Sequence, residues 1–293
     1  NIIAITAYFR GDEHKNQYLD LKKKGYKFLG ITSYLEFPGK INNPYEDTYH
    51  IKHKDDYINM CFAWCHCFRE PYKIFPKNTK LALISESDFV NTSYLKPNKT
   101  KKKYDFIYIC LRSQKKCIVG WQEYIHRWTF AKKCIELMVN KYKLKGILIG
   151  RHNCPNLPEI KNKKLLEYTT FLKYGEFINK IRESKFLFEC SESTASPRVV
   201  TESMSLNLPV LLYKNIVGGW KYINNKTGEF FIDFEDFEKN LQLLLKKHKN
   251  KKYKSRKYIL DNYGFENSGK KLLSFIKESM PEIKKTKYLK FHV

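Results

Sequence analysis

The stretch SKFLFECSESTASPRVVTESMSLNLPVLLYKNIVGGWKYINNKTGEFF, residues 184–231, decides the fold. It begins with an apolar strand that ends at Cys190–Ser191, and a polar loop then leads to a helix from about Pro197 to Leu206 and to the strand PVLLY. A strand, a crossover helix and a second strand form one unit of a parallel sheet. Because ligands of such sheets lie at the carboxyl ends of the strands, we expect a ligand site in the loop that precedes Pro197.

The first turn of this helix has the features of an anion site. The helix begins at Ser196-Pro197, and a proline costs nothing there because its missing N–H would have no partner anyway. The amides that would point at a phosphate group are those of Arg198, Val199 and Val200. Glu202 lies one turn further along, where its carboxylate can accept hydrogen bonds from sugar or ribose hydroxyls.

Strands and helices alternate throughout the chain. The strand IIAITAYF ends at Arg10-Gly11-Asp12 and precedes a predicted helix over 13–24 and the strand YKFLGITSY. A helical segment predicted around Asp55–Phe68 and the strand KLALISESDF follow, and then NTSYLKPNKTKKK has the composition of a linker. The strands DFIYICL, GILIG and KFLFECS come after the linker, with helices between them. We therefore expect an α/β protein of two Rossmann-like lobes whose parallel sheets face a central cleft.

The order of residues in 184–231 resembles the donor-binding half of the GT-B glycosyltransferases related to family 4. The resemblance is carried by Thr-Glu-Ser-Met at Glu202, by Leu-Asn-Leu-Pro-Val after it, and by the later pairs Gly218-Gly219 and Thr227-Gly228. In that family an acidic pair separated by seven residues brackets the donor, and the second Glu, which Glu202 matches, binds the nucleotide ribose. The position eight residues before Glu202 is Thr194 instead of Glu, and Glu192 lies two residues earlier. The first acidic role, and with it retaining chemistry, therefore stays open.

Upstream, the resemblance covers residues ~104–280 in pattern. The strand DFIYICL ends at Arg112, with Lys115 and Lys116 close behind, where the family places an Arg/Lys pair on the donor pyrophosphate. Arg112 and Lys116 would equally fit the surface charge of a basic chain. Gly218-Gly219 taken alone would fit an ordinary turn. Arg198 stands where the family usually has a small or polar residue, so it faces either the donor or solvent.

The resemblance implies a nucleotide-sugar-dependent transferase of glycan biosynthesis that moves a sugar from a UDP, GDP or ADP donor to a glycan or glycoprotein acceptor. Residues 1–103 would be the acceptor-side domain, 104–264 the donor-binding domain, and 265–293 a helix and tail that pack back on the first domain. No DxD-type metal motif is evident, so we expect a metal-independent reaction without a cofactor. An exostosin-like inverting transferase, also GT-B, is the alternative enzyme.

An inverting reaction needs a general base near the acceptor hydroxyl, and the loop after the first strand offers Asp12 and His14. The alternative interpretation is a capped helix start whose acidic residues favour the helix dipole. Glu86 and Asp88, which follow the strand KLALIS, are the second choice for the base. His66 is the third choice, with buried packing as its alternative.

The formal net charge of +25 invites a nucleic-acid function, because Lys and Arg neutralise phosphates. The lysines lie in surface-like runs, and no RNP-like or zinc-finger motif organises the aromatic residues, so we expect no nucleic-acid partner. A basic nucleic-acid-binding protein with a Rossmann-like core is the alternative from another class. The charge also suits a pyrophosphate donor or peripheral contact with an acidic membrane surface. A chain so rich in Lys, Asn and Ile indicates an AT-rich source such as a large DNA virus.

The eight cysteines include no CxxC pair or repeated metal spacing, so we expect reduced thiols in a cytosol-like compartment. No apolar run approaches the ~20 residues that a membrane helix needs, and the first residues lack the features of a signal peptide. We therefore expect a soluble, cytoplasmic protein, which for a viral source would lie in the cytoplasm of the infected host cell.

Overall fold

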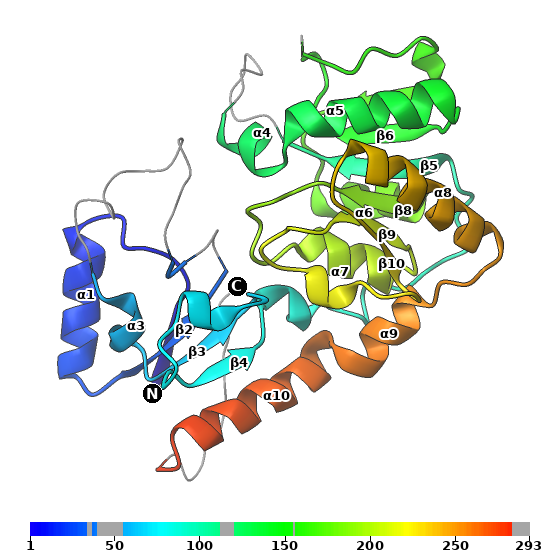
Figure 1. Cartoon of the computed structure of the whole chain (residues 1–293). Coiled ribbons are helices and arrows are strands. Elements are labelled where there is room, and N and C mark those ends of the chain that lie inside the picture. The colour runs from blue at the N-terminus through cyan, green and yellow to red at the C-terminus, as the bar shows by residue number, and fades with distance from the viewer. Residues whose placement is uncertain (34–36, 40–54, 112–119, 155, 283–293) are drawn as a thin grey trace.

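Two α/β lobes lie side by side, and the last helix runs from the second lobe back to the first (Figure 1). The structure is a computed structural model, and it describes residues 1–33, 37–39, 55–111, 120–154 and 156–282. Each lobe holds one sheet, and every strand pairing in both sheets is parallel. The prediction of an α/β protein with two parallel sheets is confirmed.

The sheet of the first lobe follows the chain in the order β1-β2-β3-β4. Pairing is in register from Ile2 opposite Lys27 to His66 opposite Leu83. The order does not reverse among the described residues, so this sheet contains no topological switch point there. Its elements are β1 (Ile2–Ile5), α1 (Asp12–Lys23), β2 (Lys27–Ile31), α3 (Tyr57–Met60), β3 (Ala63–His66), η1 (Pro71–Lys73), β4 (Leu81–Leu83) and η2 (Glu86–Phe89).

One prediction for this lobe is wrong. The segment Asp55–Phe68, expected to be helical, contains only the single turn α3 before it becomes the strand β3. All four residues of β3 are buried, because the strand lies inside the sheet between β2 and β4. A strand buried on both faces lacks polar alternation, so its sequence looks like that of a buried helix.

The sheet of the second lobe has the order β10-β9-β8-β5-β6-β7. Counted along this lobe alone, that is the doubly wound order 3-2-1-4-5-6, and it reverses between β5 and β8. Its elements are β5 (Tyr104–Ile109), α4 (Trp121–Ile125), α5 (Trp128–Glu136), the π-helical turn η3 (Leu137–Lys141), β6 (Gly146–Ile149), η4 (Lys163–Leu165), β7 (Leu166–Thr169), α6 (Tyr174–Arg182), β8 (Ser184–Glu189), α7 (Arg198–Ser205), β9 (Val210–Tyr213), η5 (Trp220–Tyr222), β10 (Gly228–Phe231) and α8 (Phe234–Lys249).

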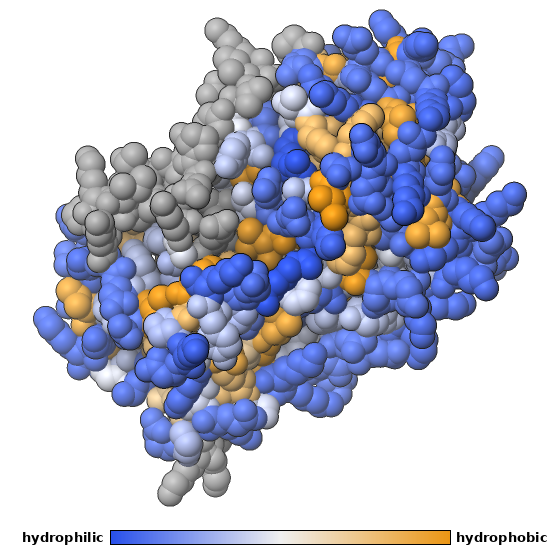
Figure 2. Space-filling view, viewed as in Figure 1, coloured by the Kyte–Doolittle hydropathy of each residue, from blue (hydrophilic) through white to orange (hydrophobic). Residues whose placement is uncertain are grey.

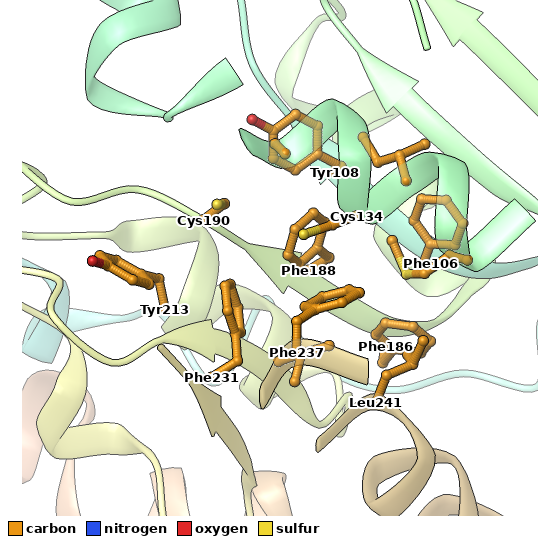
Figure 3. Close-up of a cluster of buried hydrophobic side chains, with 14 of the residues drawn as sticks. Phe106, Tyr108, Cys134, Phe186, Phe188, Cys190, Tyr213, Phe231, Phe237 and Leu241 are labelled. Carbon is orange, nitrogen blue, oxygen red and sulfur yellow. The ribbon is translucent and has the colours of Figure 1, made fainter. Parts of the chain in front are cut away.

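Side chains of this sheet alternate between two buried layers. Phe106 and Tyr108 of β5 join an aromatic cluster with Phe188 and Phe237 (Figure 3), whereas Ile107 joins a second cluster on the other face of the sheet. Val200 and Met204 of α7 belong to the second cluster, four residues apart on one helix face. Packing on this face holds α7 beside β8, where the predicted anion site begins.

The closing helices α9 (Ser255–Asn262) and α10 (Gly264–Ser279) link the lobes. Gly264, at φ 90°, allows the sharp change of direction between them. Figure 1 shows α10 crossing to the first lobe, where Leu272 and Ile276 share a buried cluster with Leu29 and Ile31 of β2. The domain boundaries at 103 and 264 stay predictions.

Cysteine usage differs from the expectation at one position. Among the residues that the structure describes, six cysteines are free thiols: Cys61, Cys65, Cys67, Cys110, Cys134 and Cys190. Cys154 is disulfide-bonded, so the expectation of reduced thiols is wrong for this residue. Spacing along the sequence does not reveal a bond between cysteines that only folding brings together.

Candidate functional site

The candidate site lies where β8 ends, next to the point where the strand order reverses. β8 ends at Glu189, and the loop 190–197 leads from there to the first turn of α7. Doubly wound sheets bind ligands at this position because the loops on either side of the reversal separate and leave a crevice. The loop before Pro197 lies at this position, and a ligand site there stays a prediction.

The first turn of α7 begins one residue later than expected. Pro197 is the N-cap and Arg198 is the first helical residue. Of the three amides expected to face a phosphate, that of Val200 donates to the Pro197 carbonyl at 3.1 Å. That part of the expectation is wrong, because the first turn tightens and uses this N–H internally. The amides of Arg198 and Val199 occupy helix positions that have no intrahelical acceptor.

The glycine pair packs directly on the loop after β8. Gly218 N–H donates to the Thr194 carbonyl at 2.9 Å, and a Cβ on Gly218 would lie 1.7 Å from the Ala195 carbonyl oxygen. A Cβ on Gly219, whose φ is 83°, would lie 2.4 Å from the ring of Pro197. Only glycine fits either position, so the pair sets the shape of the loop before α7. Direct contact of these glycines with a donor stays a prediction.

Ser196 faces the other lobe. Its hydroxyl oxygen accepts a hydrogen bond from the Ser87 N–H at 2.8 Å and lies 3.0 Å from the Ser87 hydroxyl. The residue therefore ties the start of α7 to η2 of the first lobe. Its predicted role in donor binding stays untested.

Glu202 lies on α7, one turn after Arg198. Its Oε1 accepts a hydrogen bond of 3.0 Å from the hydroxyl of Tyr174, the first residue of α6. Burial raises the pKa of Glu202, and this outweighs the opposite effects of Tyr174 and Arg198. A carboxylate has about four acceptor sites, so Glu202 can bind a further donor such as a ribose hydroxyl while it keeps the bond to Tyr174.

A buried polar group at the end of β8 was not predicted. The Ser191 hydroxyl donates to Glu189, and it lies 2.7 Å from Nδ1 of His126, the residue that ends α4. Burial alone would raise the pKa of Glu189, but the hydrogen bonds from His126 and Ser191 hold it below its usual range. His126 lies 65 positions from Ser191 in the chain, so only the fold brings the group together.

A second unpredicted group holds the end of β5. Arg151 follows β6, is almost fully buried, and donates to Oε1 of Glu123 at 2.9 Å. Its guanidinium also lies 4.5 Å from the ring centre of Trp128 and donates to Cys110 Sγ at 2.6 Å. A buried ion pair is retained only where several contacts compensate its desolvation. This group fixes Cys110, from which the chain leads to the predicted pyrophosphate residues Arg112, Lys115 and Lys116; these three lie outside the described residues.

The predicted base residues of the first lobe lie in the first turn of α1. Asp12 begins the helix and His14 follows, and both side chains are exposed. Nδ1 of His14 accepts the N–H of Arg10 at 3.2 Å, so a neutral His14 carries its proton on Nε2. Without a free lone pair, His14 can act as a base only if this bond breaks. The catalytic role of Asp12 and His14 stays a prediction.

The second-choice base residues have different surroundings. Asp88 is buried, pairs with Lys221 of the second lobe at 2.8 Å and accepts a hydrogen bond from Tyr222. The Glu86 residue is exposed, but neighbouring atoms partly shield its carboxylate from water. This desolvation raises the pKa of Glu86 and outweighs the lowering effects of Arg198 and Ser33. His66 is buried, and burial together with Lys221 lowers its pKa to about 4, so it is neutral near pH 7.

Among the residues that the structure describes, no group of three His, Cys, Asp or Glu side chains is arranged to hold a metal ion. No described helix has the length and apolar character needed to cross a membrane.

The comparison with solved structures decides the fold. No protein-family profile matches the chain, and no curated protein sequence matches it. A glycosyltransferase from Rickettsia africae superposes on 96% of this chain and 77% of its own length, with a TM-score of 0.65 at 14% identity. The fold is GT-B. A second GT-B neighbour, HepE from Anabaena solved with UDP-glucose, matches 94% of this chain and 78% of its own, with a TM-score of 0.62 at 9% identity.

TarM is a third GT-B neighbour, with a TM-score of 0.63 at 15% identity. The match covers 94% of this chain but 54% of TarM, so the chain spans about half the length of that protein. Another neighbour, the pneumococcal O-GlcNAc transferase GtfA, was solved with UDP and GlcNAc. At these identities the likeness concerns the fold alone.

Proposed function

We propose that this chain is a glycosyltransferase of the family 4 type that transfers a sugar from a nucleoside-diphosphate donor to a glycan or glycoprotein. The observation that carries the proposal is the first turn of α7, which begins at the reversal of the strand order with Glu202 one turn behind it. A helix start favours a phosphate, and a carboxylate one turn later favours hydroxyl groups. A nucleoside diphosphate carries both kinds of group.

The departing diphosphate needs positive charge to stabilise it. The amides of Arg198 and Val199, the positive end of the α7 dipole and the side chains of Arg112 and Lys116 would supply that charge. Such fixed charges can take the place of a divalent cation, so the proposed reaction is independent of metal. UDP is the first nucleotide to test, because several GT-B neighbours were solved with it; GDP and ADP donors come next.

A peripheral contact with an acidic membrane surface belongs to this proposal. Lysines gather near the amino ends of β5 and β8 and at the end of α8, where burial and the positive charges of Lys185 and Lys102 lower the pKa of His248. Hydrophilic side chains dominate the surface near α8 in the view of Figure 2. This edge lies opposite the carboxyl ends of the strands, so contact with anionic lipids would leave the donor site open.

The test is donor binding and transfer by the Glu202→Ala variant. Calorimetry with UDP, GDP and ADP sugars should identify one donor for the wild-type chain. Transfer by Glu202→Ala should fall at least about a hundredfold, because two charge-assisted hydrogen bonds to the ribose are lost. The melting temperature should stay close to wild type, since Tyr174, the partner left behind, is half exposed.

A matched control is Glu266→Gln, in the first turn of α10, where the exposed carboxylate pairs with Lys270. It should retain full activity. Full activity of Glu202→Ala, or no binding of any nucleotide sugar by the wild-type chain, would contradict the proposed function.

A further inference from the structure

Tyr174 contacts the carboxylate that the proposed function places on the ribose. It is the first residue of α6, and its hydroxyl donates to Oε1 of Glu202 on α7 at 3.0 Å. Burial and the nearby carboxylate raise the pKa of Tyr174, so the hydroxyl keeps its proton and is the donor in this bond. Oε2 of Glu202 makes no hydrogen bond within the described part of the chain. The contact therefore holds one carboxylate oxygen in place and leaves the other for a ligand.

The ring of Tyr174 is held by the segment that links the two lobes. The ring of Tyr94 stacks on it at a centroid distance of 6.2 Å and an interplanar angle of 19°. Tyr94 lies in an ordered turn, since its N–H donates to Oδ1 of Asn91 at 3.0 Å and the next residue, Leu95, is buried. Arg256 of α9 donates to the Leu95 carbonyl at 2.6 Å. Because this turn supports the ring, the Tyr174 hydroxyl keeps its direction at a reduced cost in side-chain entropy.

We propose that Tyr174 is a positioning residue that orients Glu202 toward the hydroxyl groups of the donor ribose. This inference rests on the proposed function and deepens it, because it makes the site selective for ribonucleotides over 2′-deoxyribonucleotides. The 2′- and 3′-hydroxyls of ribose lie on neighbouring carbons and on the same side of the ring. A carboxylate with one oxygen fixed by a protein donor presents its remaining acceptor sites to such a pair in one direction. A carboxylate free to rotate loses part of that discrimination.

The groups that set the charge of Glu202 come from both lobes. Burial raises the pKa of Glu202, and the hydrogen bond from Tyr174 and the charge of Arg198 lower it by less. Tyr94 faces Tyr174, and Glu86 of η2 faces Arg198. Protonation of Glu202 removes acceptor sites, so ribose binding should weaken as the pH falls through this pKa. Since Tyr174 lowers the pKa, loss of its hydroxyl should move this weakening to higher pH.

The test is a double-mutant cycle between Tyr174→Phe and Glu202→Ala. Calorimetry with UDP, GDP and ADP identifies the nucleotide that binds, and its 2′-deoxy form is then compared with it. The wild-type chain should bind the ribo form about ten- to a hundredfold more tightly. Tyr174→Phe should weaken binding of the ribo form about tenfold and change binding of the 2′-deoxy form by less than about threefold. In the Glu202→Ala background, Tyr174→Phe should change neither affinity by more than about twofold, because the two residues act as one unit.

Tyr142→Phe is the matched control. Its hydroxyl also donates to a glutamate, Glu238 of α8, and neither residue belongs to the proposed site. This variant should keep the wild-type affinity for both nucleotide forms. The pH dependence of binding gives a second measurement: the loss of affinity in acid should begin at higher pH in Tyr174→Phe and at the wild-type pH in Tyr142→Phe.

The outcomes separate this inference from the proposed function. Additive losses in the double variant would overturn the inference, because Tyr174 would then act on the nucleotide or on the fold without Glu202. A Tyr174→Phe variant with wild-type affinity and wild-type discrimination would overturn it as well. Both results leave the proposed function standing if the wild-type chain binds a nucleotide and Glu202→Ala does not transfer. If the wild-type chain binds none of the three nucleotides, the proposed function fails, and the role of Tyr174 fails with it.

Discussion

The carboxyl edges of the two sheets differ in how they are closed. In the second lobe the strand order reverses between β5 and β8, and the start of α7 lies at the reversal with polar groups around it. In the first lobe the order runs straight through among the described residues, and an aromatic cluster packs on the sheet: Phe37 lies at ring-centre distances of 4.8–5.3 Å from Tyr8, Tyr57 and Trp64. A reversal of strand order leaves room for a ligand, and the described part of the first sheet has no such reversal. η2 is an element of the first lobe that reaches across to the start of α7, where Ser87 donates its N–H to Ser196.

The largest expected effect concerns the element that reaches across. Asp88→Ala leaves Lys221 buried without its partner, so we expect the free energy of unfolding to fall by about 3–5 kcal/mol. Denaturant unfolding measures this loss. The control is Asp261→Ala, which breaks the exposed pair with Lys257 and should cost no more than about 0.5 kcal/mol. Equal, small losses in the two variants would mean that η2 does not join the lobes.

The next effect is the loss of folding stability in acid through the carboxyl edge of the first sheet. Burial lowers the pKa of His66 to about 4, below the ordinary value of 6.5, so the unfolded chain takes up this proton first as the pH falls. The His66 contribution to stability is therefore present above pH 6.5 and is lost progressively between pH 6.5 and 4, by about 3 kcal/mol in total.

His66→Gln should make the dependence of unfolding free energy on pH shallower over that window, by about one proton. The control is His14→Gln, which removes an exposed imidazole. An unchanged slope in His66→Gln would show that other groups cause the loss of stability in acid.

A change at the carboxyl edge of the second sheet should alter the affinity for the donor. Arg112 follows the end of β5, just outside the described residues, and a charge-assisted contact with a pyrophosphate contributes about 1.5–3 kcal/mol. Arg112→Ala should weaken donor binding roughly ten- to a hundredfold with little change in melting temperature. Calorimetry with the nucleoside diphosphate measures this. Unchanged affinity would mean that Arg112 is a surface charge.

The smallest expected effect is that of chelation. If helix amides and basic side chains stabilise the departing diphosphate, activity should stay near its original value in EDTA. A radiolabelled transfer assay with and without the chelator is sufficient. Loss of activity that manganese restores would place a metal at the second edge and contradict the proposed role of the α7 start.

Much of the carboxyl edge of the second lobe could be predicted from the sequence, because the residues that form it lie close together in the chain. Pro197, Glu202 and the glycine pair lie within one short stretch, and rules for helix starts and turns apply to each. The fold requires glycine at position 218, because a side chain there would overlap the Ala195 carbonyl.

The groups that could not be predicted depend on contacts between distant residues. Glu189 with His126, Arg151 with Glu123, and Asp88 with Lys221 each join parts of the chain that only folding brings together. The strand β3 has the sequence pattern of a helix because it is buried on both faces and short, and periodicity does not separate those two cases.

The path of α10 has a consequence for synthesis. A ribosome releases the four strands of the first sheet early, but Leu272 and Ile276, which complete the packing over β2, emerge only after the whole second lobe. Until then, an apolar face of the first lobe stays exposed to solvent or to a chaperone. The second lobe, in contrast, has its own core as soon as α8 is made. The part made first is therefore the last to be finished, and a nascent chain that stops before Gly264 should expose that face to proteases and to other chains.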